Sequence, residues 1–365
     1  MRGSLLVSAI AAVGLLAATT AASAQSAQDL VAPNSLERCF LKKTPSTPMF
    51  QRKAKRGPYR IAFSNSYYGN NWRTEMLNIA RAYAKQPAVA HYIKKFDIRN
   101  AGNNVAQQVA QVRQMILAGY DAILIEAASP SGLDSVINQA VHHGILVVAF
   151  DNTVTTNKAI NINENQYDMG RLWAQFLVKE TGGKGKVLMV RGLAGTTVDN
   201  DQGDGAMAVF KKHPGIKTVQ VYGNWDVGTN QKVAADALAT NHDLAGVWGT
   251  EGMTGTLQAF LQLHAQLVPM TSESDNGFMM LAVRHKLPAL VIGQSPALVA
   301  AALRAAIAAL DGQAVPLDAN IPLNPVTTSE MKAGVNYFPK QPSSFVTNIN
   351  IPQCGIHIPV AGAIK

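Results

Sequence analysis

The sequence predicts an α/β protein built from two doubly wound, Rossmann-like lobes. The chain has 365 residues, which is long enough for two domains. Its hydrophobic content of 47% indicates a globular protein with a sizeable core. From residue 59 onward, short β-rich runs alternate with amphipathic helices, which is typical of right-handed βαβ units and parallel sheets. About ten such runs favour two sheets over one.

The first half of the chain contains four predicted strands, at 59–63, 96–101, 121–128 and 145–151. Predicted helices follow the first three strands. In the first helix, over 72–86, Trp72, Met76, Ile79 and Tyr83 share one face at helical spacing. The second helix spans 104–119, and the third ends at Gly144.

The second half repeats the pattern. Strands are predicted at 186–192, 217–225, 244–249, 267–273 and 289–293, each followed by a helix. The last helix opens with Ser295 and Pro296, a good N-cap and first-turn pair. Asp226 is placed to cap the helix that follows Trp225.

Residues 1–24 have the features of a secretory signal peptide. Arg2 gives a positive start, residues 5–18 are almost entirely apolar, and Ala22-Ser23-Ala24 forms a cleavage site. The apolar run is too short to span a membrane, and no later run approaches about 20 apolar residues. We therefore expect an exported, soluble, periplasmic protein that is cleaved after Ala24.

The net charge of +9 comes mostly from one segment. Nine basic and two acidic residues precede residue 61, whereas the rest of the chain carries 23 basic and 21 acidic residues. The basic character belongs to a proline-containing tail at 25–58, which is predicted to be a solvated spacer. No nucleic-acid partner is expected; contact of the tail with anionic lipid is the less favoured alternative.

Only two cysteines occur, Cys39 in the tail and Cys354 near the C-terminus. In an oxidising compartment they can form one disulfide that joins the tail to the end of the fold. Two unpaired thiols are the alternative, and the disulfide is favoured.

Polar and aromatic residues gather where the predicted strands end. In open parallel sheets, ligands bind beyond the carboxyl ends of the strands. Only the end of the strand at 121–128 is poor in such groups, because it offers Glu126 and small residues. The candidate binding residues at the other strand ends are Asn70, Trp72, Arg73, Asp151, Asn152, Asn200, Trp225, Glu251, Asp275, Asn276 and Gln294.

This set of side chains suits a neutral polyhydroxyl ligand. Asp, Asn, Gln and Arg form paired hydrogen bonds with hydroxyls, and flat Trp faces suit the C–H faces of a sugar ring. Arg73 at a helix N-terminus is electrostatically misplaced unless a ligand or carboxylate pairs with it. Trp72 and Trp225 also suit a core position, and Asp151 also suits a turn or cap.

The sequence resembles the periplasmic sugar-binding proteins of ABC transporters, ribose/galactose type. The matching motifs are Asn70-Asn71-Trp72-Arg73 after the first strand, Asp151 after the fourth, the turn "GLAGTT" at 192–197, and Gln294-Ser295-Pro296. The resemblance implies sugar contacts for Asn70, Trp72, Arg73, Asp151 and Gln294. It matches Trp225 to the family's stacking aromatic, and Asp275 or Asn276 to its second-lobe carboxylate.

The resemblance also implies the domain organisation. One lobe would comprise 59–163 plus 295–323, and the other 164–294 plus 324–350, with three crossings between them and a C-terminal extension at 351–365. Such a protein is expected to be a monomer that closes on a monosaccharide or sugar alcohol and delivers it to an ABC permease in the inner membrane. Asn152, Asn200 and Thr250-Glu251 depart from the usual family residues, so a different monosaccharide or a polyol is expected.

Enzymatic and regulatory alternatives find weaker support. The segment at 181–187 lacks the end of a P-loop, and 293–297 is a near miss to a nucleophile elbow. The segment at 199–205 is similar to a calcium-binding loop but lacks the spacing of its ligands. No HExxH or CxxC motif occurs either, so no metal is expected, and no cofactor is expected. A doubly wound hydrolase, a repressor and a sugar sensor for a chemoreceptor or kinase remain the alternatives; the export signal argues against the repressor.

Overall fold

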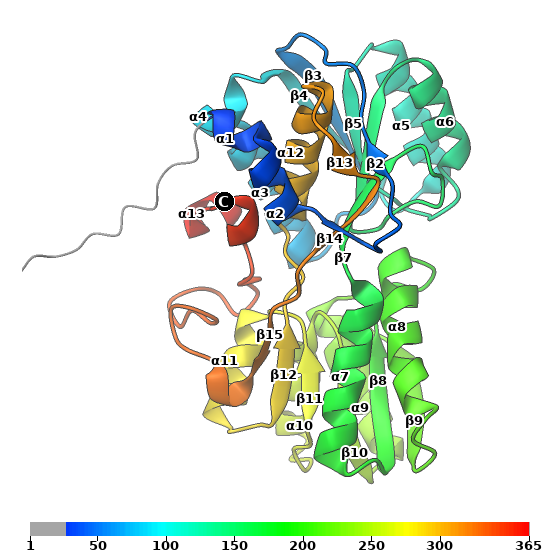
Figure 1. Ribbon diagram of the computed structural model, residues 1–365. Coiled ribbons are helices and arrows are strands. Elements are labelled where there is room, and N and C mark those ends of the chain that lie inside the picture. Colours follow the sequence, from blue (N-terminus) through cyan, green and yellow to red (C-terminus); the bar gives the residue numbers. More distant parts are fainter. Residues whose placement is uncertain (1–26, 365) are drawn as a thin grey trace, which may run out of the picture.

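The computed structural model describes residues 27–364 and has two lobes, each built around a mainly parallel sheet (Figure 1). The predicted fold class, two doubly wound α/β lobes, is confirmed. In the N-terminal lobe the sheet order is β1-β14-β7-β6-β5-β3-β4, and in the C-terminal lobe it is β15-β12-β11-β10-β8-β9. The edge strands β1 and β15 pair antiparallel with their neighbours, and all other pairs in these sheets are parallel.

The N-terminal lobe buries both faces of its sheet under helices. Its strands are β1 (Leu41–Lys42), β3 (Tyr59–Asn65), β4 (Ile93–Asn100), β5 (Ala122–Glu126), β6 (Leu146–Phe150), β7 (Ile160–Glu164) and β14 (Asp318–Ile321). Its helices are α1 (Ala27–Val31), α2 (Pro33–Cys39), α3 (Asn71–Ala84), α4 (Pro87–Ala90), α5 (Val105–Leu117), α6 (Asp134–His142), α12 (Leu298–Leu310) and α13 (Val360–Ala363). Alternate residues of β3 point to opposite faces: Ile61 and Phe63 pack with α3 and α12, whereas Ala62 packs with α5 and α6.

The C-terminal lobe follows the same plan. Its strands are β8 (Gly185–Arg191), β9 (Ile216–Tyr222), β10 (Leu244–Gly249), β11 (Met270–Ser272), β12 (Ala289–Ile292) and β15 (Pro325–Thr327). Its helices are α7 (Gln166–Thr181), α8 (Thr197–Phe210), α9 (Val227–Thr240), α10 (Met253–Gln262) and α11 (Asn276–Arg284). Short 3-10 helices occur at Thr328–Glu330 and Pro352–Cys354, and a separate two-stranded sheet joins β2 (Met49–Phe50) to β13 (Val315–Pro316).

All nine predicted strands are present, but six further strands among residues 27–364 were not predicted, and β7 is the longest of them. This strand, Ile160–Glu164, alternates apolar and polar residues, and its polar Asn161 and Asn163 masked its β character. Asn161 is held by hydrogen bonds to Val154 and Asp318 within the lobe. The last long helix begins at Leu298, not at Ser295; Ser295 still accepts hydrogen bonds from the turn that precedes the helix.

The expectation that residues 25–58 form a solvated spacer is wrong for the described part of that segment. Leu30, Leu36 and Phe40 are buried in the core of the N-terminal lobe, and β1 joins its sheet. The many basic residues of this segment led to the wrong prediction. Its few apolar residues include Leu30 in α1 and Leu36 in α2. The signal peptide and its cleavage site lie outside the described residues.

The C-terminal segment also departs from the expected division. After β15 the chain bonds the backbone of the C-terminal lobe as far as Asn348; Ser343 accepts from Gly277, and the amide of Asn348 donates to Gly293. Its return to the N-terminal lobe begins at Val346, and Val346, Ile349 and Ile351 enter the core there (Figure 1). The backbone N–H of Val346 donates to Glu75 of α3. This return adds a fourth passage between the lobes to the three that the resemblance implied.

The expected disulfide between Cys39 and Cys354 is present, with an S–S distance of 2.03 Å. It joins α2 to the end of the returning segment, and both cysteines are fully buried. Arg304 of α12 lies beside the disulfide and donates hydrogen bonds to Leu30, Ser35 and Cys354. Among residues 27–364, no helix is long and apolar enough to cross a membrane.

We predict that Gly170→Ala destabilises the C-terminal lobe. Gly170 of α7 lies against the backbone of α8, and an added methyl group would overlap the carbonyl group of Gln202. Because backbone atoms cannot move aside as a side chain can, the two helices must separate, at a cost of about 1–3 kcal/mol or more. A lower midpoint of thermal unfolding is the expected result.

Gly228→Ala is the matched control. Gly228 is exposed in α9, and the nearest atom to its added methyl group is a carboxylate oxygen of Asp226 at 3.5 Å. This variant should unfold at or above the wild-type midpoint, because alanine favours a helix over glycine. Equal midpoints for the two variants would contradict the close packing of α7 on α8.

Candidate functional site

A small pocket lies between the lobes, beyond the carboxyl ends of both sheets. Its wall is formed by nine residues: Asn70, Trp72, Arg73, Asp151, Val198, Trp225, Glu251, Glu273 and Gln294. The lobes nearly meet across it, leaving about 10 Å³ that the centre of a water molecule can occupy, or room for about one water. A larger ligand enters only when the lobes separate.

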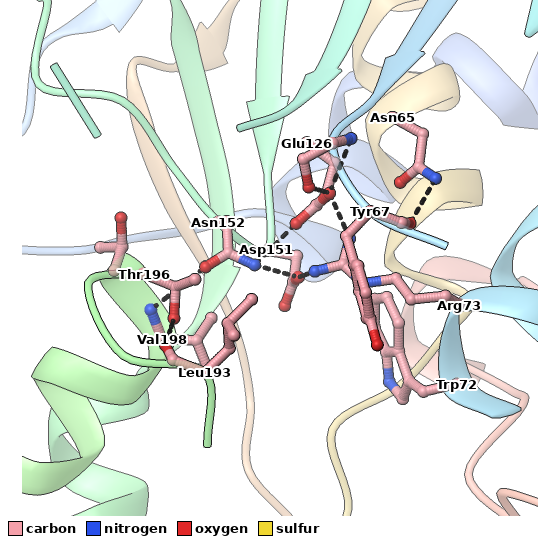
Figure 2. A network of polar contacts seen from close by, with 12 residues as sticks. Asn65, Tyr67, Trp72, Arg73, Glu126, Asp151, Asn152, Leu193, Thr196 and Val198 are labelled. Carbon is pink, nitrogen blue, oxygen red and sulfur yellow. Dashed lines mark hydrogen bonds and ion pairs between the residues drawn. The ribbon is translucent and has the colours of Figure 1, made fainter. Parts of the chain in front are cut away.

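Arg73 is the cation at the centre of the pocket. It lies in the first turn of α3 and is 3% exposed. Its guanidinium forms ion pairs with Glu126 at the end of β5 and with Asp151 after β6, the latter at 3.3 Å (Figure 2). Burial alone lowers the pKa of Arg73, but the two carboxylates outweigh it and raise that pKa above its ordinary value. Arg73 therefore stays charged and is held in one position.

Hydrogen bonds from two side-chain amides, Asn152 and Gln294, hold the carboxylates that pair with Arg73. The amide of Asn152 donates to Glu126 at 2.6 Å and to Asp151 at 3.0 Å, and the amide of Gln294 also donates to Asp151. Asp151 has φ of 58°, in the left-handed region that few residues other than glycine adopt. Backbone strain at a polar pocket residue is typical of functional sites.

Several hydrogen bonds join the lobes at the pocket, and two of them reach the beginnings of helices. Asn70 caps α3 by accepting from the backbone N–H of Arg73 at 2.8 Å, and its amide donates to Glu251 of the other lobe at 3.0 Å. The side-chain oxygen of Asn152 accepts from the backbone N–H of Val198 at 3.4 Å. These bonds connect the N-terminal lobe to the beginnings of two C-terminal-lobe helices, so the lobes are in a closed arrangement.

Two tryptophans form the apolar part of the wall. Trp72 is 3% exposed and donates from its indole nitrogen to the carbonyl of Gln294 at 3.1 Å. Trp225 is 6% exposed and has φ of 59°. Its ring lies directly on Gly192, where any side chain would overlap it. The absence of a side chain at Gly192 therefore leaves the space that the ring of Trp225 occupies.

The carboxylates of the C-terminal lobe have raised pKa values. Burial is the main cause for both Glu251 and Glu273, and their proximity to each other and to Asp275 adds to the effect. Glu251 accepts from the Asn70 amide and the Trp72 backbone, whereas Glu273 accepts from the amide of Gln202 at 3.3 Å.

Four predicted residues do not line the pocket. Asn152 instead supports the pocket from behind, through its hydrogen bonds to Glu126 and Asp151. Asn200 is exposed on α8, because the preceding Asp199 is the residue that turns inward and pairs with Arg191 at 2.8 Å. Asn276 is buried but bonds the backbone of the returning C-terminal segment at Phe338, Gln341 and Pro342. Asp275 is buried against the backbone amides that begin α10. The structure thus gives Asn276 and Asp275 structural partners.

The sequence analysis missed three residues of the site. Glu126 was discounted because its neighbours are small, yet it binds Arg73 and Asn152. Glu273 is the last residue of the strand predicted at 267–273, two positions before the chosen Asp275. Val198 carries no chemical signal in the sequence. Asp226 caps α9 as predicted, by accepting from the backbone N–H of Thr229 at 2.7 Å.

The buried carboxylates predict that stability falls as the pH rises. Burial raises the pKa of Asp151 and Asp275 to about 7 and that of Glu75 and Glu164 to about 8. Between about pH 4.5 and 8 the folded protein therefore binds more protons than the unfolded chain, so the free energy of unfolding decreases with pH. The midpoint of thermal unfolding should be higher at pH 5.5 than at pH 8 at constant ionic strength. A midpoint that rises over this range would contradict the burial of these groups.

A family model described as the periplasmic binding protein domain matches residues 61–314, well over half of the chain. The chain belongs to this family. The periplasmic binding protein is 27% identical over 173 residues to the galactofuranose-binding protein YtfQ of Escherichia coli, covering 45% of this chain and 51% of that protein. It is 28% identical over 193 residues to the D-ribose/D-allose-binding protein of Pseudomonas aeruginosa, covering 51% and 60%. The matched region thus spans about half of these relatives.

A solved relative covers more of the periplasmic binding protein. The ABC transporter solute-binding protein of Thermobispora bispora has 30% sequence identity and a TM-score of 0.69, and the match covers 73% of this chain and 84% of that one. The resemblance drawn from the sequence motifs is therefore confirmed at the level of the family. Among residues 27–364, no group of three or more His, Cys, Asp or Glu side chains is placed to hold a metal ion.

Proposed function

We propose that this protein captures a monosaccharide or sugar alcohol between its lobes and delivers it to an ABC permease in the inner membrane. The observation that carries the proposal is the composition of the interlobe pocket, which combines two tryptophans with charged and amide side chains from both lobes. The names of the relatives, which bind galactofuranose, ribose and allose, point to the same class of ligand.

The pocket chemistry suits hydroxyl groups. A sugar hydroxyl both donates and accepts, so it satisfies a carboxylate such as Asp151 and a guanidinium such as Arg73 at the same time. Trp72 and Trp225 offer flat apolar surfaces to the C–H groups of a ring. Because these polar groups are buried, a ligand that lacks a matching hydroxyl leaves one of them unpaired and binds weakly.

Ligand binding would favour the closed arrangement of the lobes. The proposed lobes are 59–163 plus 295–323 and 164–294 plus 324–350, except that the chain from Val346 onward packs in the core of the first lobe. A ligand that contacts Arg73 and Asp151 on one side and Glu251 and Trp225 on the other interacts fully only when the lobes close. Its binding energy then shifts the open–closed equilibrium by hinge bending, and a permease can recognise the closed state.

The protein is proposed to bind its ligand without converting it. Among residues 27–364, those that line the pocket include no serine, cysteine or histidine, which are the nucleophiles and base of Ser-His and Cys-His hydrolases. With residues 1–24 as a signal peptide that is cleaved after Ala24, the protein would act in the periplasm. It is proposed to act there as a monomer.

A thermal-unfolding panel on refolded, ligand-stripped mature protein tests the proposal. The panel covers pentoses, hexoses, sugar alcohols, nucleosides and amino acids. A ligand at 100 times its dissociation constant adds about 2.7 kcal/mol of stability. For a protein of this size, the midpoint should then rise by several degrees. A rise with one sugar or polyol and not with its epimers, together with recovery of the compound unchanged, is the expected result.

Two results would count against the proposal. If the midpoint rises for an amino acid or nucleoside and for no sugar or polyol, the assigned class of ligand is wrong. If the responding sugar is recovered in altered form, the protein is an enzyme.

A further inference from the structure

The interlobe pocket is lined by more acidic than basic side chains. Among residues 27–364, Arg73 is the single cation that lines it, and Glu126 and Asp151 already pair with that guanidinium (Figure 2). Glu251 and Glu273 line the opposite wall, where no lysine, arginine or histidine among residues 27–364 forms an ion pair with either. The wall formed by the C-terminal lobe is therefore rich in unpaired carboxylates.

Glu273 is the least satisfied of these groups. It is 3% exposed, lines the pocket, and has one hydrogen bond in the described structure, from the neutral amide of Gln202 at 3.3 Å. A carboxylate has about four acceptor sites, and burial of its charge is costly unless the charge is paired. A ligand group that donates several hydrogen bonds and carries positive charge would complete this site.

The surroundings of Glu273 leave the ligand to supply that charge. The acids Asp275, Asp151 and Glu164 all raise the pKa of Glu273, and Glu273 in turn raises the pKa of Glu251. The guanidinium of Arg73 forms its ion pairs with Glu126 and Asp151. A metal ion is not indicated, because the described residues contain no group of side chains placed to hold one.

Trp225 adds a second feature that suits a cation. An ammonium group near the face of a tryptophan ring is attracted by the electrons of that ring. Trp225 lines the same pocket as Glu251 and Glu273, and the strained backbone at φ 59° together with Gly192 holds its ring in place. One face of Trp72 is already covered by the guanidinium of Arg73, which lies 5.2 Å from the centre of the ring.

We propose that the ligand is a polyhydroxyl compound that carries a protonated amine, such as an amino sugar or an aminocyclitol, and that Glu273 and Glu251 bind its ammonium group. This inference rests on the proposed function and narrows its class of ligand. In this arrangement Arg73 and Asp151 bind hydroxyls at one end of the ligand. The ammonium group donates to the acidic wall at the other end and lies against Trp225.

The test compares matched pairs of ligands on ligand-stripped wild-type protein by titration calorimetry at pH 7. The pairs are glucosamine and glucose, galactosamine and galactose, mannosamine and mannose, and an aminocyclitol and myo-inositol. N-acetylated forms of the three amino sugars keep the shape of the ring but remove the charge. At least one amine should bind 10-fold or more tightly than its hydroxyl partner, and N-acetylation should abolish that advantage.

Variants locate the ammonium group. Glu273→Gln should reduce the preference for the amine over its hydroxyl partner at least 10-fold. Glu180→Gln, which changes an exposed acid of α7 in the same lobe, is the matched control and should leave the preference unchanged. Because the ligand pairs are compared on wild-type protein, the test does not depend on the folding of Glu273→Gln.

The outcomes separate this inference from the proposed function. A neutral sugar or polyol that binds as tightly as its amine would overturn the ammonium assignment and leave the proposed function standing. Binding of neither the amines nor any neutral sugar or polyol would overturn both. An amine preference that survives Glu273→Gln would remove Glu273 from the site.

Discussion

Replacement of Arg73 by alanine is expected to abolish ligand binding and to lower the midpoint of thermal unfolding. Among residues 27–364, its guanidinium is the one cation that lines the pocket, and it pairs with Glu126 and Asp151. Its removal takes away charged hydrogen bonds to the ligand, each worth about 1.5–3 kcal/mol, so affinity should fall at least about 100-fold. It also leaves two buried carboxylates unpaired, which costs about 3–5 kcal/mol. Calorimetric titration and thermal unfolding measure the two effects.

Arg81→Ala is the control for these measurements, and Asp151→Asn is a second test of the pocket. Arg81→Ala removes an exposed arginine from the same helix and should change neither property. Asp151→Asn keeps the shape of the side chain and suits the left-handed backbone at φ 58°, so it should weaken ligand binding with a smaller loss of stability. Normal ligand binding by both Arg73→Ala and Asp151→Asn would show that the ligand binds elsewhere.

Arg304→Met is expected to destabilise the N-terminal lobe strongly without a direct effect on the ligand pocket. Arg304 is fully buried in α12, and its guanidinium donates to the carbonyls of Leu30 and Cys354 and to the hydroxyl of Ser35. Methionine fills much of the volume but leaves these buried acceptors unsatisfied, at about 1–3 kcal/mol each. The midpoint of thermal unfolding should fall by several degrees or more.

The control for this variant is Arg284→Met, at an exposed arginine in the last turn of α11. It should unfold within about a degree of the wild type, since surface substitutions usually change stability by less than about 0.5 kcal/mol. Ligand affinity of folded Arg304→Met should match the wild type, because Arg304 does not line the pocket. An unchanged midpoint for Arg304→Met would contradict the role of Arg304 in holding the terminal segments.

The fold was readable from the sequence where local pattern and tertiary role agree. The alternation of apolar strands and amphipathic helices gave nine strands and the two-lobed class, because fully buried parallel strands are continuous apolar runs. It failed at the N-terminal tail, where basic residues outnumber the buried Leu30, Leu36 and Phe40. Leu30, Leu36 and Phe40 are buried because they pack in the same core as α12 and because the disulfide holds this segment against the lobe. The local sequence does not contain that information.

The site was readable where function depends on the position of a strand end. The ends of β3, β6 and β12 supply the pocket residues Arg73, Asp151 and Gln294, as expected. Glu126 was missed because its role depends on which side chain of another element reaches it. Asn200 was chosen over Asp199 because the sequence does not show which face of α8 turns inward.

The most direct test of the whole account is a crystal structure of the mature protein with the compound that gives the largest rise in the thermal panel. The account predicts that the compound lies between the lobes and contacts Arg73 and Asp151 on one side and Glu251, Glu273 and Trp225 on the other. A compound bound at another surface, such as the cavity beside Phe176 and Leu287 in the C-terminal lobe, would contradict the proposed site.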